Sequence, residues 1–265
     1  MTRRIQVSST TNHSSFIAHH ACIRQDRSRI VATAYTKERP PMLVVQCWDD
    51  GVTADARLIE ILRRHGAKAT FNLNPGLHGP TRGHGWTYRG TEVLRFARDE
   101  LAAVYDGFTI ANHSLTHPHL DQIPPDTARR EIADARDALQ QQFAQPVDGF
   151  AYPFGRYNDT VMHLVRAAGH TYARTTVIAH QPFPPADPMA LHPSCHFLAP
   201  DFWARFEQAR LAHHTFYFWG HSFELTTEPM WSAFDAQIER ITHTPDATWS
   251  DITTALNPPP ASLRR

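Results

Sequence analysis

Short apolar runs alternate with longer amphipathic stretches along most of the chain. The short runs are rich in β-branched and aromatic residues and are bounded by glycine or proline, a pattern typical of buried strands. They predict seven strands, at residues 42–48, 68–73, 108–112, 149–152, 171–176, 189–193 and 215–220. The longer stretches have apolar residues at helical spacing, and the clearest predicted helices are residues 54–66, 127–143 and 158–170.

The alternation of strands and helices predicts an α/β fold with parallel strands, either a barrel or a doubly wound sheet. No internal sequence repeat accompanies the alternation. In such folds the residues that carry chemistry lie at the carboxyl ends of the strands. The candidate functional residues of this chain are therefore those that follow its predicted strands.

The two ends of the chain differ from this middle part. Residues 1–40 are rich in Ser, Thr, His and Arg, have little periodicity and run into a Pro-Pro pair, so they predict a loosely structured N-terminal arm. Residues 258–265 begin with three prolines and predict a flexible tail. Residues 41–257 are then the expected folded domain.

Charge and composition exclude several classes of protein. Lys and Arg together number 26, as do Asp and Glu, so the chain lacks the basic excess that binds nucleic acids or anionic membranes. No apolar run reaches the length of a membrane span or of a signal-peptide core. The three cysteines are widely spaced and indicate neither a disulfide framework nor a zinc cage. We therefore expect a cytoplasmic protein with no nucleic-acid partner and no membrane span, and a misassigned start codon would leave export open.

Histidine is unusually frequent, with 18 residues. The third predicted strand runs into His113 and His117, whose spacing lets both imidazoles reach one ion from a tight loop or a helical turn; Pro118 favours the loop. The first predicted strand ends in Asp49 and Asp50, adjacent carboxylates that point opposite ways on an extended chain. One carboxylate with two histidines leaves metal positions for water, and the second carboxylate can act as a base. Each motif alone also fits an ordinary turn or a solvated surface pair.

Two further strand ends carry candidate residues. The fourth predicted strand ends in Tyr152-Pro153-Phe154-Gly155, a turn that can aim the backbone N–H of Phe154 at an oxyanion. The same sequence also fits a common aromatic-proline-glycine turn. His221 follows the last predicted strand, where a proton donor is expected, although a lone histidine there is more often structural.

Taken together and in this order, the segments resemble the NodB-like polysaccharide deacetylases of carbohydrate esterase family 4. The family motif TFDDG corresponds to CWDDG at 47–51, and HSxxH corresponds to HSLTH at 113–117. The motif RxPYG or RxPFG corresponds to AYPFG at 151–155, and the final motif, a histidine after an apolar strand, corresponds to WGHS at 219–222. The resemblance covers residues 42–255 and implies a distorted (β/α) barrel of about seven parallel strands.

The resemblance also implies roles for the motif residues. Asp50, His113 and His117 would hold a divalent metal, usually zinc, with cobalt or nickel as substitutes. Asp49 would be the base that activates the metal-bound water, and His221 the acid that protonates the leaving amine. Because zinc brings the pKa of bound water from about 15.7 to roughly 7, a nearby carboxylate can complete its deprotonation at neutral pH.

The chain departs from the family pattern at two points. The family has an Arg where this chain has Ala151, and that Arg pairs with the catalytic carboxylate. Arg174, at the end of the next predicted strand, is placed to replace it and to lower the pKa of Asp49, whereas a surface arginine is the ordinary alternative. The family's acidic-Trp motif is not recognisable after that strand, which bears on substrate recognition.

Aromatic residues near the strand ends are candidates for stacking on a sugar, because pyranose faces are apolar enough to pack on aromatic rings. The candidates are Trp48, Trp86, Tyr88 and Trp219. Burial in the core is the commoner explanation for such residues. His192 and His196, near the sixth predicted strand, are expected as neighbours of the site or as surface residues.

The sequence therefore predicts a metal-dependent hydrolase that removes N-acetyl or O-acetyl groups from an amino-sugar-containing polysaccharide, oligosaccharide or glycoside. Two alternatives stay open. One is a hydrolase that uses the same metal-bound water on a non-sugar amide, and the other is a catalytically silent carbohydrate-binding homologue. The presence of both carboxylates and all three motif histidines argues against the silent homologue.

Overall fold

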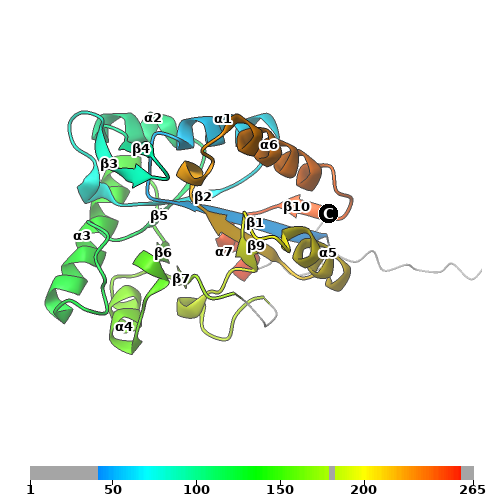
Figure 1. Ribbon diagram of the computed structural model, residues 1–265. Helices are drawn as coiled ribbons and strands as arrows, with labels where there is room; N and C mark the ends of the chain where they lie inside the picture. The colour runs from blue at the N-terminus through cyan, green and yellow to red at the C-terminus, as the bar shows by residue number, and fades with distance from the viewer. Residues whose placement is uncertain (1–40, 179–182, 258–265) are drawn as a thin grey trace, which may run out of the picture. The chain divides into compact units, whose positions relative to one another are not determined.

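The computed structural model describes residues 41–178 and 183–257 (Figure 1). The predicted arm at residues 1–40 and the predicted tail at 258–265 lie outside the described residues. In the part of the chain that is described, no helix is both long enough and apolar enough to span a membrane.

The centre of the fold is a sheet in which every strand pair is parallel. Its strands are β1 (Met42–Asp49), β2 (Thr70–Leu73), β5 (Thr109–Asn112), β6 (Gly149–Ala151), β7 (Tyr172–Arg174), β8 (Cys195–His196), β9 (Phe216–Gly220) and β10 (Ala247–Trp249). The order is β7-β6-β5-β2-β1-β9-β8, and β10 pairs with the start of β1. The seven strands of this path form a half-barrel (Figure 1), which confirms the predicted α/β fold with a distorted barrel.

Helices connect most of the parallel strands, as such a sheet requires. They are α1 (Asp55–Arg64), α2 (Leu101–Val104), α3 (Pro125–Phe143), α4 (Asp159–Ala167), α5 (Phe202–Ala212), α6 (Glu228–Thr242) and α7 (Ile252–Leu256). Short 3-10 turns are η1 (Pro75–Leu77), η2 (Arg98–Glu100), η3 (Pro153–Gly155), η4 (Pro188–Ala190) and η5 (Ser222–Glu224). Between β2 and β5 the chain also forms an antiparallel hairpin of β3 (Gly83–Tyr88) and β4 (Thr91–Arg95).

The helix ends follow local sequence signals. The side chain of Asn158 accepts a hydrogen bond from the backbone N–H of Val161 and so caps α4. Gly66 follows α1 with a φ of +61°, a left-handed conformation that glycine adopts at little cost. The apolar face predicted for α1 is buried, for example at Leu58 and Leu62.

The two faces of β1 contribute to different parts of the core. Val44 and Trp48 belong to the large apolar cluster that joins the sheet to α1 and α6, whereas Val45 and Cys47 belong to a separate cluster with residues of β7 and β9. Because side chains alternate along a strand, Asp49 continues the face of Val45 and Cys47. The last residue of β1 therefore turns its carboxylate toward the interior of the half-barrel.

The predicted strand at 189–193 is wrong. Pro188–Ala190 form a 3-10 turn that the Asp187 side chain caps, and proline at its start cannot donate to a sheet ladder. Leu191 alone pairs with the sheet there, through a single bridge to Arg174. The strand of this region is β8, further along the chain.

The β3–β4 hairpin has no counterpart among the predicted strands. Its turn is Arg89-Gly90, with φ values of +49° and +83°, the two-residue geometry of a tight hairpin. Most of its residues are exposed or half-buried, so it lacks the apolar alternation of a core strand. The Thr53 N–H donates to the Leu94 carbonyl at 2.8 Å, which ties the hairpin to the segment that follows β1.

Candidate active site

A cavity of about 630 Å³ lies at the carboxyl ends of the parallel strands. Its lining comes from β1, β7 and β9, from the loops after several strands, and from the β3–β4 hairpin. Among the lining residues are the acids, histidines and arginine that the motif analysis singles out, namely Asp49, Asp50, His113, His117, Arg174 and His221. The structure thus brings residues from four separated parts of the chain into one place.

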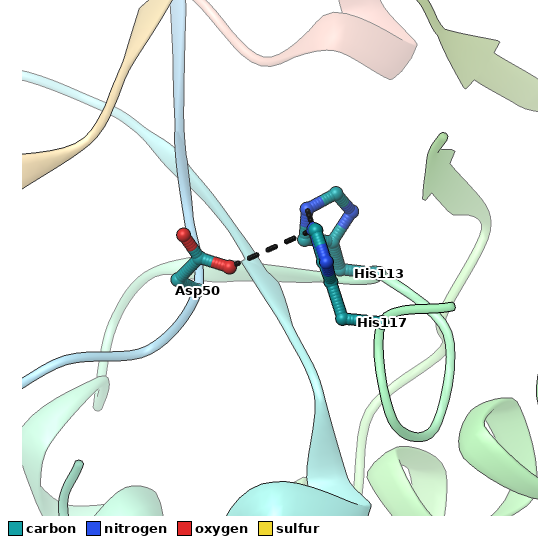
Figure 2. A group of neighbouring side chains, drawn as sticks. All are labelled: Asp50, His113 and His117. Atoms are coloured by element: carbon teal, nitrogen blue, oxygen red, sulfur yellow. Dashed lines mark hydrogen bonds and ion pairs between the residues drawn. The ribbon is translucent and has the colours of Figure 1, made fainter. Parts of the chain in front are cut away.

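Asp50, His113 and His117 lie side by side in this cavity (Figure 2). One ligand-type atom of each lies within 4.8 Å of those of the other two. The Nε2 atoms of the two histidines are 3.1 Å apart, and His117 Nε2 lies 3.9 Å from an Asp50 carboxylate oxygen. Two nitrogens bound to one tetrahedral zinc ion would be about 3.3 Å apart, so the spacing fits a shared cation.

The backbone is in an unusual conformation at Asp50, at His117 and at Ser114, which lies between the two histidines in the sequence. The φ angle is +82° at Asp50, +61° at His117 and +66° at Ser114. Left-handed conformations cost free energy in residues other than glycine, and they gather at functional sites. Hydrogen bonds stabilise them here, because the Asp50 N–H donates to the Asn72 carbonyl at 3.1 Å and the His117 N–H donates to the Ser114 hydroxyl at 3.0 Å.

Both imidazoles are neutral near pH 7. Nδ1 of His113 lies 2.7 Å from the Ala151 carbonyl, which can only accept, so Nδ1 carries the proton and Nε2 offers its lone pair. Burial lowers the pKa of His113, and burial together with the neighbouring His113 lowers the pKa of His117 to about 4. One carboxylate and two neutral imidazoles are a donor set typical of catalytic zinc sites.

Asp49 faces the same cavity but is held by protein groups. Asn72 donates a side-chain N–H to one carboxylate oxygen at 2.6 Å, and Arg174 donates to the other. Burial alone would raise the pKa of Asp49, but Arg174 and two nearby histidines lower it well below its usual range. Asp49 is therefore an ionised carboxylate with a fixed direction.

Arg174 is one of the most deeply buried charged residues of the described chain, at 1% exposure. Its guanidinium carbon lies 4.8 Å from the centre of the Trp219 ring. Burial works against the charge, but Asp49 raises the pKa of Arg174 overall, so the ion pair is maintained. The structure thus excludes the surface-arginine alternative.

His221 follows β9 and faces both aspartates. Its Nε2 atom lies 3.8 Å from an Asp49 oxygen and 3.9 Å from an Asp50 oxygen. Its Nδ1 atom lies 3.2 Å from the Glu224 carboxylate, which also lies 2.8 Å from Nε2 of His196. Burial works against the protonated ring, but Glu224 and the aspartates raise the pKa of His221 overall. His221 therefore keeps its proton to a higher pH than a free histidine does.

Glu224 is a site residue that the sequence analysis does not predict. It lies in η5 and lines the cavity. Its carboxylate also accepts from the backbone N–H of His221 at 3.2 Å, the reciprocal arrangement of a capping box. Burial works against ionisation, but His196 and His221 lower the pKa of Glu224 to about 2. The available signal was an acid three residues after the motif histidine.

Phe154 lies at the cavity with a φ of +59° and a side chain that is 52% exposed. Its ring lies 4.5 Å from that of His117 and stacks on His119 at 3.9 Å between centroids. A Cβ on the next residue, Gly155, would lie 2.0 Å from the Thr176 hydroxyl, so only glycine fits there. This packing fixes the turn that carries the Phe154 N–H.

Three of the four aromatic candidates line the cavity. Trp86 and Tyr88 come from the hairpin, and Trp219 comes from β9. Phe223, which the sequence analysis does not predict, joins the hairpin to the rest of the site. Its ring centre lies 4.9 Å from Trp86, 5.0 Å from Tyr88 and 4.9 Å from His221.

The prediction that Trp48 binds substrate is wrong. Its side chain is fully buried, and its indole N–H donates to the Gln46 side chain at 2.9 Å. The indole packs edge-on against Phe197, Phe218 and Phe234. Because neighbouring strand residues point to opposite faces, Trp48 points away from the cavity that Asp49 faces.

His192 and His196 are not among the residues that line the cavity. His196 reaches the site indirectly, through the Glu224 carboxylate. Nδ1 of His192 lies 2.6 Å from the Thr175 hydroxyl. His196 is therefore a neighbour of the site, and His192 contacts a residue outside the cavity lining.

Comparison with known families agrees with this geometry. A family model described as polysaccharide deacetylase matches residues 36–173, just over half of the chain. The chain belongs to the polysaccharide deacetylase family. The matched residues include the CWDDG, HSLTH and AYPFG motifs, and they end before Arg174 and His221.

A curated relative supports the same family. YxkH of Bacillus subtilis (strain 168), whose name places it among the polysaccharide deacetylases, is 25% identical over 144 residues. The match covers 53% of this chain and 48% of YxkH. This deacetylase family member thus spans about half the length of that curated relative.

Solved structures with similar folds come from several bacteria. The Streptococcus pyogenes deacetylase PplD in complex with acetate has a TM-score of 0.50 and 24% sequence identity, and the match covers 62% of this chain and 68% of PplD. A family 4 carbohydrate esterase from Streptomyces lividans in complex with acetate has a TM-score of 0.50 and 18% identity, and the match covers 77% of this chain and 88% of the esterase. A family 4 pseudoenzyme from Bacillus anthracis has a TM-score of 0.53 and 19% identity, and the match covers 82% of this chain and 66% of the pseudoenzyme. At these identities the likeness shows the fold alone.

The position of the family's motif arginine and Arg174 are neighbours in the sheet. The position that holds Arg in the family motif is Ala151, the last residue of β6. The register of the sheet pairs Ala151 directly with Arg174 on β7. Side chains at these two positions therefore begin at the same level of the sheet. The guanidinium of Arg174 donates to the Asp49 carboxylate.

Proposed function

We propose that this polysaccharide deacetylase family member is a metal-dependent hydrolase that removes N-acetyl or O-acetyl groups from an amino-sugar-containing polysaccharide, oligosaccharide or glycoside. One observation carries the proposal: a single cavity holds the Asp50, His113 and His117 donor set beside Asp49 and His221. Metal-assisted hydrolysis of an acetamide uses a cation site, a base and a proton donor within reach of one carbonyl group.

Asp50, His113 and His117 would hold the divalent cation. Their donor atoms suit zinc, and cobalt or nickel accept the same ligands. When bound, the cation supplies a water of lowered pKa and a Lewis acid for the acetyl carbonyl. The tautomer of His113, set by the Ala151 carbonyl, keeps Nε2 available for this purpose.

Asp49 accepts the proton of the attacking water. Its oxygen that pairs with Arg174 also lies 4.0 Å from Nε2 of His113, so the carboxylate is beside the donor set. The bond from Asn72 fixes its orientation. A fixed and ionised carboxylate needs little reorganisation to take a proton there.

His221 gives a proton to the leaving amine, which departs only after protonation. Its raised pKa favours the protonated ring, and Glu224 holds Nδ1 so that Nε2 faces the cavity. The backbone N–H of Phe154 stabilises the oxyanion that forms in the transition state. Asp49 thus accepts a proton and His221 donates one, because their surroundings lower the pKa of Asp49 and raise that of His221.

The carbohydrate part of the proposal rests on the aromatic lining and on the family. Trp86, Tyr88 and Trp219 offer ring faces on which a pyranose can pack. Residues 41–257 form the catalytic domain in this proposal.

Acetate release together with metal analysis tests the proposal. The purified protein is incubated with N-acetylated and O-acetylated sugars and oligosaccharides and with non-sugar amides, and its metal content is measured by mass spectrometry. Release of acetate from an acetylated sugar by protein that holds about one metal ion per chain supports it. Bound metal with cleavage of non-sugar amides alone contradicts it in favour of an amidase, and sugar binding without any acetate release contradicts it in favour of a silent homologue.

A further inference from the structure

Arg95, the last residue of β4, is a buried cation in the wall of the active-site cavity. The residue is 8% exposed. Its guanidinium donates one hydrogen bond to the backbone carbonyl of Asp50 at 2.6 Å, and its central carbon lies 5.2 Å from the centre of the Trp86 ring. The hairpin therefore places a positive charge against the loop that carries Asp50.

Arg95 and Arg174 are both buried, but their partners differ. Arg174 forms an ion pair with Asp49. Over residues 41–178 and 183–257, no carboxylate lies within 4.0 Å of a guanidinium nitrogen of Arg95, and the Asp50 carbonyl is its one hydrogen-bond acceptor. The charge of Arg95 is therefore not balanced by a direct contact.

The two carboxylates that act on Arg95 from further away are already engaged. Asp55 accepts hydrogen bonds from two buried hydroxyl groups, at 2.5 and 2.6 Å. The Asp50 carboxylate faces the histidines of the site, with His117 and His221 each at 3.9 Å. Both acids therefore have other partners, and they act on the charge of Arg95 only over a longer distance.

No nitrogen of Arg95 is among the fully buried atoms without a hydrogen-bond partner, so its other N–H groups keep some access to the cavity. An anion that accepts hydrogen bonds from a mostly buried guanidinium binds it more strongly than water does. The guanidinium group has five N–H donors in a planar fork, which matches the oxygens of a carboxylate or a phosphate. In Arg95 the Asp50 carbonyl takes one donor. The remaining donors belong to a side chain that lines the substrate cavity.

We propose that Arg95 binds an anionic group of the substrate, a carboxylate, phosphate or sulfate carried by the acetylated sugar. This inference rests on the proposed function and narrows its substrate class to acidic acetylated sugars in preference to neutral ones. Arg95 belongs to the β3–β4 hairpin, which stands outside the parallel sheet. In this proposal the hairpin determines the preference for acidic substrates, and the residues at the strand ends carry out the hydrolysis.

A purely structural role for Arg95 makes a different prediction. Because Arg95 also holds the Asp50 carbonyl, its replacement would loosen the cation site and slow the turnover of every substrate alike. If Arg95 instead binds a substrate anion, its replacement slows the turnover of acidic substrates more than that of neutral ones. The informative quantity is therefore the ratio of their kcat/KM values.

Matched sugars test this ratio. The panel is N-acetylglucosamine, its 1-phosphate, its 6-phosphate, its 6-sulfate and N-acetylglucosaminuronic acid. The variants are Arg95→Met, which removes the charge, Arg95→Lys, which keeps the charge but loses the fork, and Arg130→Met as the control. Arg130 is an exposed arginine of α3 that does not line the cavity, so it controls for net charge.

The wild type is expected to prefer at least one acidic sugar over the neutral one by about tenfold or more. Arg95→Met should lose that preference, Arg95→Lys should keep part of it, and Arg130→Met should keep it in full. An acidic-to-neutral ratio that is the same in Arg95→Met and in the wild type overturns the inference. The phosphates, the sulfate and the uronic acid show which anion is recognised.

Binding without turnover separates this inference from the proposed function. Metal-free wild type and the same variants are titrated with the same sugars in a calorimeter. Tighter binding of an acidic sugar that is lost in Arg95→Met supports the inference even where no sugar is deacetylated. Acetate release that does not depend on Arg95 supports the proposed function and overturns the inference, as does equal binding of acidic and neutral sugars.

Discussion

Arg174 and Asp49 form a buried ion pair between β7 and β1, two strands that are separated in the sheet by β6, β5 and β2. The guanidinium therefore reaches across the interior of the half-barrel. Removal of one partner of a buried pair leaves an uncompensated charge, so the two side chains depend on each other. The pair sets both the ionisation and the direction of the proposed base.

Replacement of Arg174 by Met should shift the pH dependence of the reaction. Without the cation, burial raises the pKa of Asp49, so the acid limb of the pH–rate profile moves to higher pH and kcat at neutral pH falls by about tenfold or more. Arg166→Met, which removes a surface partner of Asp187, is the control and should keep the wild-type profile. An unchanged profile in Arg174→Met would contradict the role given to the ion pair.

A metal ligand and a base should fail in different ways. Asp50→Ala or His117→Ala removes a donor and should abolish stable metal binding. Asp49→Asn should retain the metal and lower kcat by about 10²–10⁴-fold, the usual contribution of a general base. Metal content and kcat, measured on the same preparations, distinguish the two results. Normal turnover by Asp49→Asn would mean that another group is the base.

Loss of the Glu224 carboxylate should move the alkaline limb of the profile. Glu224 helps to raise the pKa of His221, so in Glu224→Gln the proton donor is lost at lower pH and the alkaline limb moves to lower pH. Glu228→Gln removes an exposed acid that pairs with Arg57 and serves as the control. If the alkaline limb stays in place in Glu224→Gln, His221 is not the group that the limb reports.

Two tryptophans should separate stability from substrate binding. Trp48→Ala empties a fully buried site and should lower the free energy of unfolding by about 3–5 kcal/mol with KM unchanged. Trp86→Ala removes a half-buried ring from the cavity wall and should raise KM for an acetylated sugar by about fivefold with a smaller loss of stability. Denaturant unfolding and steady-state kinetics measure both effects. A raised KM in Trp48→Ala would restore the prediction that the structure overturned.

Much of the site could be predicted because its residues follow parallel strands. The carboxyl ends of such strands converge, so Asp49, His113 and His221 had to lie near one another once the alternation of strands and helices was recognised. Arg174 was found by the same rule, as a charged residue at the end of a buried strand. Local patterns also sufficed for the helix caps and for most strand positions.

The remaining features depend on tertiary structure. Both faces of a central parallel strand are buried, so hydrophobicity could not show that Trp48 faces the helices while Asp49 faces the interior. Arg95 and Phe223 lie in a hairpin and a short turn, whose positions relative to the strand ends no local pattern encodes. The run at 189–193 is apolar because it is buried, although it forms a turn.

The measurement that tests the account most directly is acetate release during titration of the metal-stripped protein with Zn²⁺. An N-acetylated sugar that the untreated protein deacetylates serves as substrate, and His117→Ala serves as the matched variant. A deacetylase that depends on this metal site should release no acetate before zinc is added, should reach its maximal rate at about one equivalent per chain, and should show no recovery in His117→Ala. Release at the full rate by the metal-stripped protein, or full recovery in His117→Ala, would contradict it.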